Sequence, residues 1–227
     1  MDEIFSTDRC ILLIYPPGAS GKFLSNCLSM HSRFVYQHVN AIFNKTPIQR
    51  FARLMTLINE NKMLLKYRWN DLCLGDWQFF GISNYMDDKS SIITHQTNLY
   101  NNHIHYAAIK EIISENKYFF RVCHNVAEFN FYNEMWPNNK TILFYNTEEW
   151  INVRNSGCIQ FNWDDNKPIQ IEQSTTTNYF KFDCLSFCSK ENFIKEYTQL
   201  LAKFELLPEN LDFVSIIYDE YMKLYFK

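Results

Sequence analysis

Features that would place this chain in a membrane or outside the cell are missing from its sequence. The first ten residues, MDEIFSTDRC, are acidic, and they lack the positively charged start and the apolar run of a signal peptide. No run of about 18 apolar residues, the length that a helix needs to cross a bilayer, occurs anywhere in the chain. We therefore expect a soluble, cytoplasmic protein with no membrane partner.

A basic excess is also missing. The chain has 22 Lys and Arg residues against 25 Asp and Glu residues, and its formal net charge is −3. Proteins that bind nucleic acid without regard to its sequence use clustered Lys and Arg to displace counterions from the phosphates. The charge balance therefore argues against nucleic acid as a partner.

The seven cysteines lack the CxxC spacing of redox and zinc sites, and their number is odd. Most of them lie in apolar segments, where Cys behaves as a small hydrophobic residue, so we expect reduced thiols in the core. His103 and His105 lie two positions apart, but they have no further ligands at the spacing of a metal site. The sequence therefore predicts no metal site.

Residues 10–31 carry the clearest local pattern in the chain. The apolar run Cys10-Ile-Leu-Leu-Ile-Tyr15 predicts a buried strand, and the turn Pro16-Pro17-Gly18-Ala19-Ser20-Gly21 ends it before a helical period begins. The start of a helix leaves backbone N–H groups unpaired and carries a partial positive charge, and small residues let an anion approach it. The sequence therefore predicts a phosphate-binding strand, turn and helix, as in P-loop proteins.

Strand-like and helix-like segments alternate along the rest of the chain. This alternation predicts an α/β fold with one domain over residues 1–227, in which helices cover both faces of a mostly parallel central sheet, as in P-loop NTPases. We expect a helical and aromatic insertion at about 32–90 and a mobile polar connection at about 155–178. The further predicted strands are 91–95, 118–123, 141–145 and 179–184; the further predicted helices begin near Thr46, Ile104, Asn125, Asn146, Ser189 and Pro208.

The turn matches the Walker pattern G-x-x-x-x-G-K-[ST] only in part. It keeps Gly21-Lys22, but Pro16 stands at the first glycine and Phe23 at the final hydroxyl residue. That hydroxyl holds Mg²⁺ in nucleotide kinases and NTPases, so its loss disfavours a magnesium-dependent phosphoryl transfer. Lys22 either contacts a phosphate or is an exposed lysine of the first helical turn, and Ser20 either donates to the anion or caps the helix.

Two parts of the chain resemble the sulfotransferase family. The phosphosulfate loop of that family reads roughly Y-P-K-S-G-T-T-W-L, against Tyr15-Pro-Pro-Gly-Ala-Ser-Gly-Lys-Phe-Leu24 here. Downstream, the family has a strand that ends in a catalytic His, then a helix, a proline and a strand of the form K-x-I-x-x-x-R-N-P-x-D. The same order is present here in Phe120-Arg-Val-Cys-His124, Trp136-Pro137 and Lys140-Thr-Ile-Leu-Phe-Tyr-Asn146, with His124 lying 22 residues before Asn146.

The resemblance implies an enzyme of the sulfotransferase type with no metal. It would transfer a sulfuryl group from a donor of the 3′-phosphoadenosine 5′-phosphosulfate type to a hydroxyl or amine of a small-molecule or carbohydrate acceptor. His124 would be the general base, since a neutral His suits that task at neutral pH, and Lys22 would assist catalysis. The residues implied to bind the donor are Gly18, Ala19, Ser20, Gly21, Lys22, Phe23, Asn146 and Arg154.

The chain also departs from the family at charged positions. The loop lysine of the family falls at Ala19 and its arginine at Asn146, so Lys22 and Arg154 would have to supply these charges. Asn146 is either a donor ligand or the N-cap of a helix, with Glu149 three residues later. His124 is either a base or a structural His at the end of a strand. A P-loop kinase or NTPase, and a degenerate nucleotide-binding member without catalysis, therefore stay open as alternatives.

Overall fold

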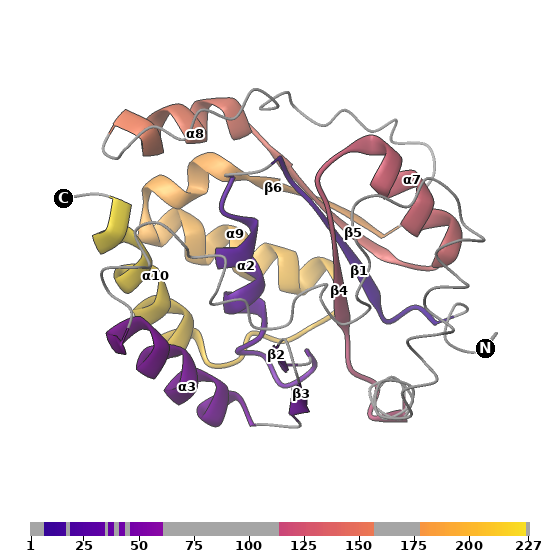
Figure 1. Cartoon of the computed structure of the whole chain (residues 1–227), viewed down its shortest axis with the longest axis horizontal. Coiled ribbons are helices and arrows are strands. Elements are labelled where there is room, and N and C mark those ends of the chain that lie inside the picture. Colours follow the sequence, from indigo (N-terminus) through magenta and orange to yellow (C-terminus); the bar gives the residue numbers. More distant parts are fainter. Residues whose placement is uncertain are drawn as a thin grey trace.

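A computed structural model describes residues 7–16, 19–34, 36–38, 41–43, 46–60, 114–156 and 178–225. Its main sheet has four strands in the order β4-β1-β5-β6, and all its neighbouring strands are parallel (Figure 1). The strands are β1 (Cys10–Ile14), β4 (Phe119–Cys123), β5 (Lys140–Tyr145) and β6 (Tyr179–Asp183), with a separate hairpin of β2 (Tyr36–His38) and β3 (Ala41–Phe43). The helices are α2 (Gly21–Leu28), α3 (Pro47–Glu60), α7 (Val126–Met135), α8 (Thr147–Ser156), the 3₁₀ helix η4 (Cys184–Cys188), α9 (Lys190–Lys203) and α10 (Leu211–Tyr225).

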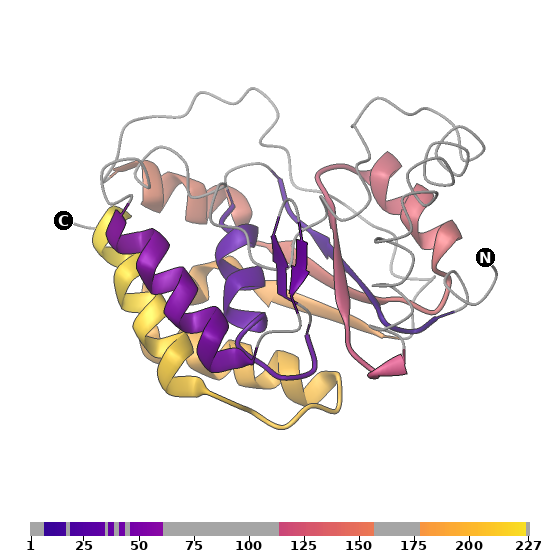
Figure 2. The same cartoon turned by 60° about the horizontal axis from the view of Figure 1, so that its bottom comes forward.

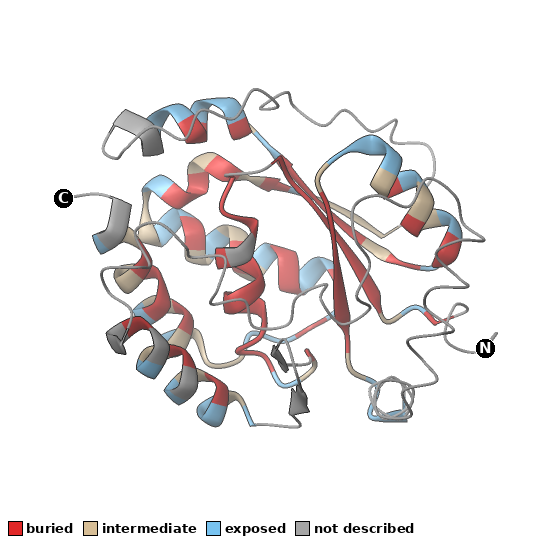
Figure 3. Ribbon diagram, viewed as in Figure 1, coloured by how far each residue is buried: buried red, intermediate tan, exposed pale blue. Residues whose placement is uncertain are grey.

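Helices cover both faces of this sheet, which confirms the predicted α/β fold. Every residue of β1 is buried, as expected for a continuous apolar strand inside a parallel sheet. On one face, Ile11 and Leu13 pack in a core with apolar side chains of α2, α9 and α10. On the other face, α7 contacts β1 and β4 (Figures 1 and 3). The central strand is therefore shielded from water on both sides.

The segment at about 32–90 departs in part from the predicted helical and aromatic insertion. It contains the antiparallel hairpin β2–β3 as well as α3, and residues 61–90 lie outside the described residues. Helix α3 runs beside α10 (Figure 2), where the rings of Phe51 and Phe213 stack with centroids 4.3 Å apart. The part of this segment that the structure describes therefore packs against the C-terminal helix.

The predicted caps decide where several helices begin. Thr46 and Gln49 form a reciprocal capping box, because the Gln49 N–H donates to Thr46 Oγ1 (3.4 Å) and the Thr46 N–H donates to Gln49 Oε1 (3.0 Å). Ser189 caps α9 by accepting the Asn192 N–H (3.4 Å). The last helix begins at Leu211 and not near Pro208, since residues 206–210 belong to no helix or strand and Asn210 has a φ of 51°.

Other predicted segments fall partly or wholly outside the described residues. The predicted strand at 91–95 and the helix near Ile104 lie outside them, as do residues 157–177 of the predicted mobile connection. The first two residues of that connection, 155 and 156, belong to α8. None of the helices in the described ranges combines the length and the apolar character needed to cross a bilayer.

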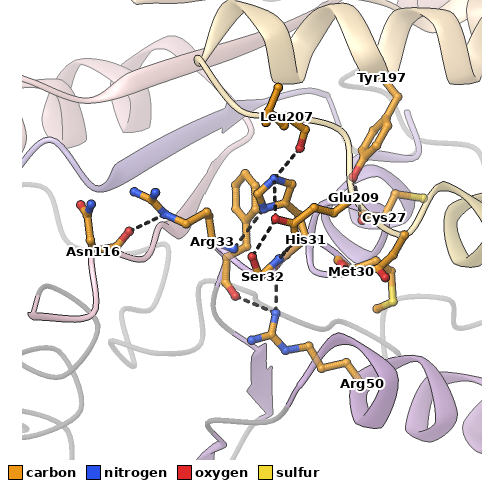
Figure 4. Close-up of polar contacts among 12 residues, drawn as sticks. Cys27, Met30, His31, Ser32, Arg33, Arg50, Asn116, Tyr197, Leu207 and Glu209 are labelled. Carbon is orange, nitrogen blue, oxygen red and sulfur yellow. Dashed lines mark hydrogen bonds and ion pairs between the residues drawn. The ribbon is translucent and has the colours of Figure 1, made fainter.

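The C-terminal end of α2 is buried, and side chains from distant segments bind carbonyl groups of its last turn and of the residues that follow it (Figure 4). A helix end leaves its final C=O groups without partners inside the helix, and leaving such a group buried and unpaired costs about 1–3 kcal/mol. The buried Arg50 of α3 donates from Nη1 to three carbonyl oxygens that follow α2, those of Ser29, His31 (3.4 Å) and Phe34. The donor and acceptor pairs are Arg50 to Ser29 O (2.8 Å) and Phe34 O (2.7 Å), Tyr197 to Cys27 O (3.2 Å), and Asn210 to Met30 O (2.8 Å).

His31 lies in the same cluster of contacts and is neutral. Its Nδ1 accepts the Arg33 N–H (3.0 Å), so the ring proton is on Nε2, which donates to Leu207 O (3.0 Å). Burial lowers the pKa of His31, and the charges of Arg33 and Arg50 add to this, whereas Glu209 (3.8 Å from Nε2) and the bond to Leu207 oppose it. Protonation at Nδ1 would remove the acceptor for Arg33 and open the turn after α2.

We predict that stability falls when the pH is lowered below about 6.5, the ordinary pKa of a histidine. Because the pKa of His31 is lowered in the folded chain, the unfolded chain binds a proton in this range that the folded chain does not. Urea unfolding at pH 7.5 and 5.5 measures the effect. The variant His31→Gln, which keeps an acceptor and a donor but does not titrate, should show a smaller loss. An equal loss in both proteins would contradict the assignment to His31.

Candidate functional site

The carboxyl ends of three neighbouring strands gather most of the residues that the sequence singles out. In the register of the sheet, Ile14 of β1 lies beside Cys123 of β4 and Leu143 of β5. The turn after β1 therefore lies next to His124, which follows β4, and to the end of β5. Ligands of open parallel sheets bind outside the carboxyl ends of the strands, near the point where the strand order reverses. Strand β1 is that point, because the chain continues from it to β4 on one side and later to β5 on the other.

The N-terminus of α2 is suited to an anion. The side chain of its N-cap residue, Ser20, makes no capping hydrogen bond, and its first turn contains no acidic residue. Ser20 precedes the helix in the left-handed region (φ 71°, ψ 21°), and its carbonyl accepts the N–H groups of Phe23 (3.0 Å) and Leu24 (3.3 Å). The N–H of Ala19 donates back to Pro16 O (3.1 Å). The peptide groups at the start of α2 thus keep the partial positive charge that favours a phosphate or sulfate group.

The Ser20 hydroxyl is held inside the protein. Trp150 of α8 donates from Nε1 to Ser20 Oγ (3.1 Å), and the Tyr221 hydroxyl of α10 donates to the same oxygen. Trp150 and Tyr221 are both almost fully buried. The hydroxyl of Ser20 therefore joins the turn to α8 and α10, and the predicted role of Ser20 as a side-chain cap of α2 is wrong.

Phe23 and Ala19 both have fully buried side chains. The ring of Phe23 stacks on Tyr221 with centroids 4.1 Å apart and an interplanar angle of 12°, and it also contacts Phe193 (5.1 Å). At this position a Walker motif would carry the hydroxyl that holds Mg²⁺, whereas here the side chain anchors α2 in the aromatic core. The side chains of these two residues are therefore not available to a ligand, and their N–H groups already donate to Pro16 O and Ser20 O.

Gly21 is required by the packing of Tyr15. A methyl group at residue 21 would overlap the ring of Tyr15, which is 3% exposed. From the sequence, we expect the small residues of this turn to let phosphate oxygens approach. The structure adds a second reason at Gly21, because an aromatic ring lies directly against the first residue of α2.

His124 contacts the same tyrosine. Its Nδ1 lies 3.0 Å from the carbonyl oxygen of Tyr15, and the two rings meet edge to face with centroids 5.0 Å apart. A carbonyl oxygen can only accept, so Nδ1 carries the proton in the neutral ring and Nε2 is the basic nitrogen. This is the tautomer that a general base acting through Nε2 requires, and His124 is partly exposed.

Asn146 lies directly before α8 in the left-handed region, with φ of 53°, and its carbonyl accepts the Trp150 N–H (3.1 Å). Its side-chain amide donates to Asp183 Oδ1 (3.1 Å) at the end of β6, and Asp183 also accepts the Leu185 N–H (3.0 Å). The N–H of Asp183 in turn donates to Glu196 (3.0 Å), whose pKa is raised by burial and by the charge of Asp183. The amide of Asn146 is thus engaged with the neighbouring strand.

The predicted binding of the sulfuryl donor by three residues stays a prediction. Gly18 and the side chains of Lys22 and Arg154 lie outside the described residues. The backbone of Arg154 belongs to α8. In the described ranges, no group of three His, Cys, Asp or Glu side chains is arranged to hold a metal ion.

Four residues near the site were not assigned to it from the sequence: Tyr15, Trp150, Asp183 and Tyr221. Tyr15 directly follows the first strand, and this position in the sequence could have placed it at the site. Trp150 and Tyr221 lie 130 and 201 residues from Ser20 in the chain, and no local pattern connects them to the turn. Only the folded chain brings them together.

The fold and the site define an α/β protein with an anion-favouring turn beside a histidine. Comparisons of the chain with models of protein families, with curated proteins and with solved structures gave no match.

We predict that Gly21→Ala destabilises the protein by about 1–3 kcal/mol, the usual cost of overpacking a filled core. The added methyl group would meet the Tyr15 ring, so the cost should shrink when Tyr15→Leu is already present. A double-mutant cycle by urea unfolding measures this coupling. The same cost of Gly21→Ala in both backgrounds would show that Tyr15 is not the cause.

Proposed function

We propose that this protein is a sulfotransferase-like enzyme. It binds a donor of the 3′-phosphoadenosine 5′-phosphosulfate type against the start of α2 and transfers the sulfuryl group to a hydroxyl or amine of a small-molecule or carbohydrate acceptor. The observation that carries the proposal is the hydrogen bond between His124 Nδ1 and the Tyr15 carbonyl. It makes Nε2 the basic nitrogen of a histidine that lies next to the anion-favouring turn.

The transfer needs one proton to be moved. Nε2 of His124 takes the proton of the acceptor hydroxyl as the acceptor oxygen forms a new bond to sulfur. The bond between that sulfur and the 5′-phosphate oxygen breaks, and 3′-phosphoadenosine 5′-phosphate leaves. The backbone N–H groups at the start of α2 stabilise the charge that builds up on the leaving phosphate. A base placed in this way typically contributes about 10²–10⁴-fold to the rate.

The packing of Phe23 supports this donor over a magnesium nucleotide. A kinase or NTPase of the P-loop class uses a hydroxyl at this position to hold Mg²⁺. Here the Phe23 ring is fully buried against Tyr221, so the position cannot supply a metal ligand without opening the core. The proposed transfer needs no metal.

Thermal-shift measurements with 3′-phosphoadenosine 5′-phosphate and with ATP plus Mg²⁺ test the donor. A ligand that binds only the folded chain stabilises it by about 2.7 kcal/mol at a hundred times its Kd. We expect stabilisation by 3′-phosphoadenosine 5′-phosphate without metal. Stabilisation by ATP and Mg²⁺ alone would favour a nucleotide kinase or NTPase, and no shift with either ligand would favour a protein that acts through protein contacts.

We predict that His124→Gln lowers sulfuryl transfer by about 10²–10⁴-fold and leaves the thermal shift with 3′-phosphoadenosine 5′-phosphate nearly unchanged. A glutamine can still donate to the Tyr15 carbonyl, but it cannot take up a proton. Transfer of labelled sulfate to a panel of phenols, sugars and amines measures the activity. Lost donor binding, or turnover equal to that of the wild type, would remove His124 from the role of base.

A further inference from the structure

We infer that Glu128 is a positioning residue, which holds the His124 ring in the orientation that makes Nε2 the base. The carboxylate oxygen Oε2 of Glu128 accepts the backbone N–H of His124 at 2.6 Å. The inference rests on the proposed function for the catalytic role of His124, but the contact itself does not depend on it.

The contact differs from an ordinary capping box by one residue. Asn125 caps α7 as the sequence predicts, by accepting the Glu128 N–H at its side-chain oxygen (2.9 Å). In a capping box the Glu side chain would reach back to the N–H of the cap residue itself. Here it reaches one residue further, to His124, which is the last residue before the cap. The carboxylate therefore acts on the peptide group that carries the candidate base.

Residue 124 is attached to the end of β1 on two sides. The Tyr15 N–H donates to Cys123 O (3.1 Å), which holds the end of β4 against the end of β1. The ring of His124 then turns back to the Tyr15 carbonyl, with Nδ1 at 3.0 Å. Between these two contacts lies the peptide N–H that Glu128 binds. Its short, charge-assisted bond fixes the direction in which the Cα–Cβ bond of His124 leaves the backbone.

The loss of this bond should affect orientation more than folding. Glu128 is partly exposed, and Asn125 would still cap α7 without its carboxylate. The His124 N–H could then bind water, and the ring would be free to leave the Tyr15 carbonyl. A displacement of about 1 Å at a catalytic group costs about 10²-fold in rate.

The variants Glu128→Ala and Glu128→Gln separate position from charge, and Glu134→Ala is the matched control. Glu134 lies on the same helix and carries the same charge. The ¹⁵N resonances of the histidine rings report which nitrogen carries the proton, and loss of one ring signal in His124→Gln assigns His124. We expect the proton on Nδ1 in the wild type, in Glu134→Ala and in Glu128→Gln, and a mixture of both tautomers in Glu128→Ala.

We expect the rate of sulfuryl transfer to fall in the variant that loses the Nδ1 proton. Glu128→Ala should lose about 10²-fold in sulfuryl transfer with an unchanged thermal shift from 3′-phosphoadenosine 5′-phosphate, and Glu128→Gln should recover most of the loss. An Nδ1 proton that persists in Glu128→Ala would overturn the inference, whatever happens to turnover. A tautomer that changes as expected in a protein that transfers no sulfuryl group would sustain the role of Glu128 and reject the proposed function.

Discussion

The fold depends on how the polar ends of one buried helix are satisfied. Every described side chain of α2 is buried, so the carbonyl groups at its C-terminal end cannot rely on water (Figure 3). Leaving such groups unpaired would cost more free energy than most single contacts return. Side chains from α3, α9 and the segment before α10 bind the carbonyl groups of Cys27 in its last turn and of Ser29 and Met30 just after it (Figure 4). At the start of α2 the side chain of Ser20 makes no capping hydrogen bond, and this asymmetry is what makes the start of the helix a candidate ligand site.

The same helix connects the candidate site to the aromatic core. Ser20, at its start, is held by Trp150 and Tyr221, and the ring of Phe23 stacks on Tyr221 one turn later. Tyr15 lies against Gly21 on one side and against His124 on the other. The described residues on either side of the turn are therefore held by buried aromatic side chains, and catalysis and precise binding depend on such support.

The local patterns of the sequence predicted most of the described elements, and they failed where distant residues decide the contact. The apolar run at β1 and the caps at Thr46, Asn125 and Ser189 act within a few residues, so their effects can be seen in the sequence. The hairpin β2–β3 was missed because two three-residue strands give almost no periodicity. The bonds from Trp150 and Tyr221 to the Ser20 hydroxyl could not be foreseen because these partners come from α8 and α10.

The sequence by itself determined that a strand, a tight turn and a helix follow one another at 10–28, and that a histidine ends a later strand. Periodicity, turn residues and caps act over short distances along the chain, so these features do not need the rest of the molecule. The tertiary structure alone decided that β4 pairs with β1, which brings His124 to the Tyr15 carbonyl and sets its tautomer. Strand order and ring orientation depend on how the whole core packs, and no segment contains that information.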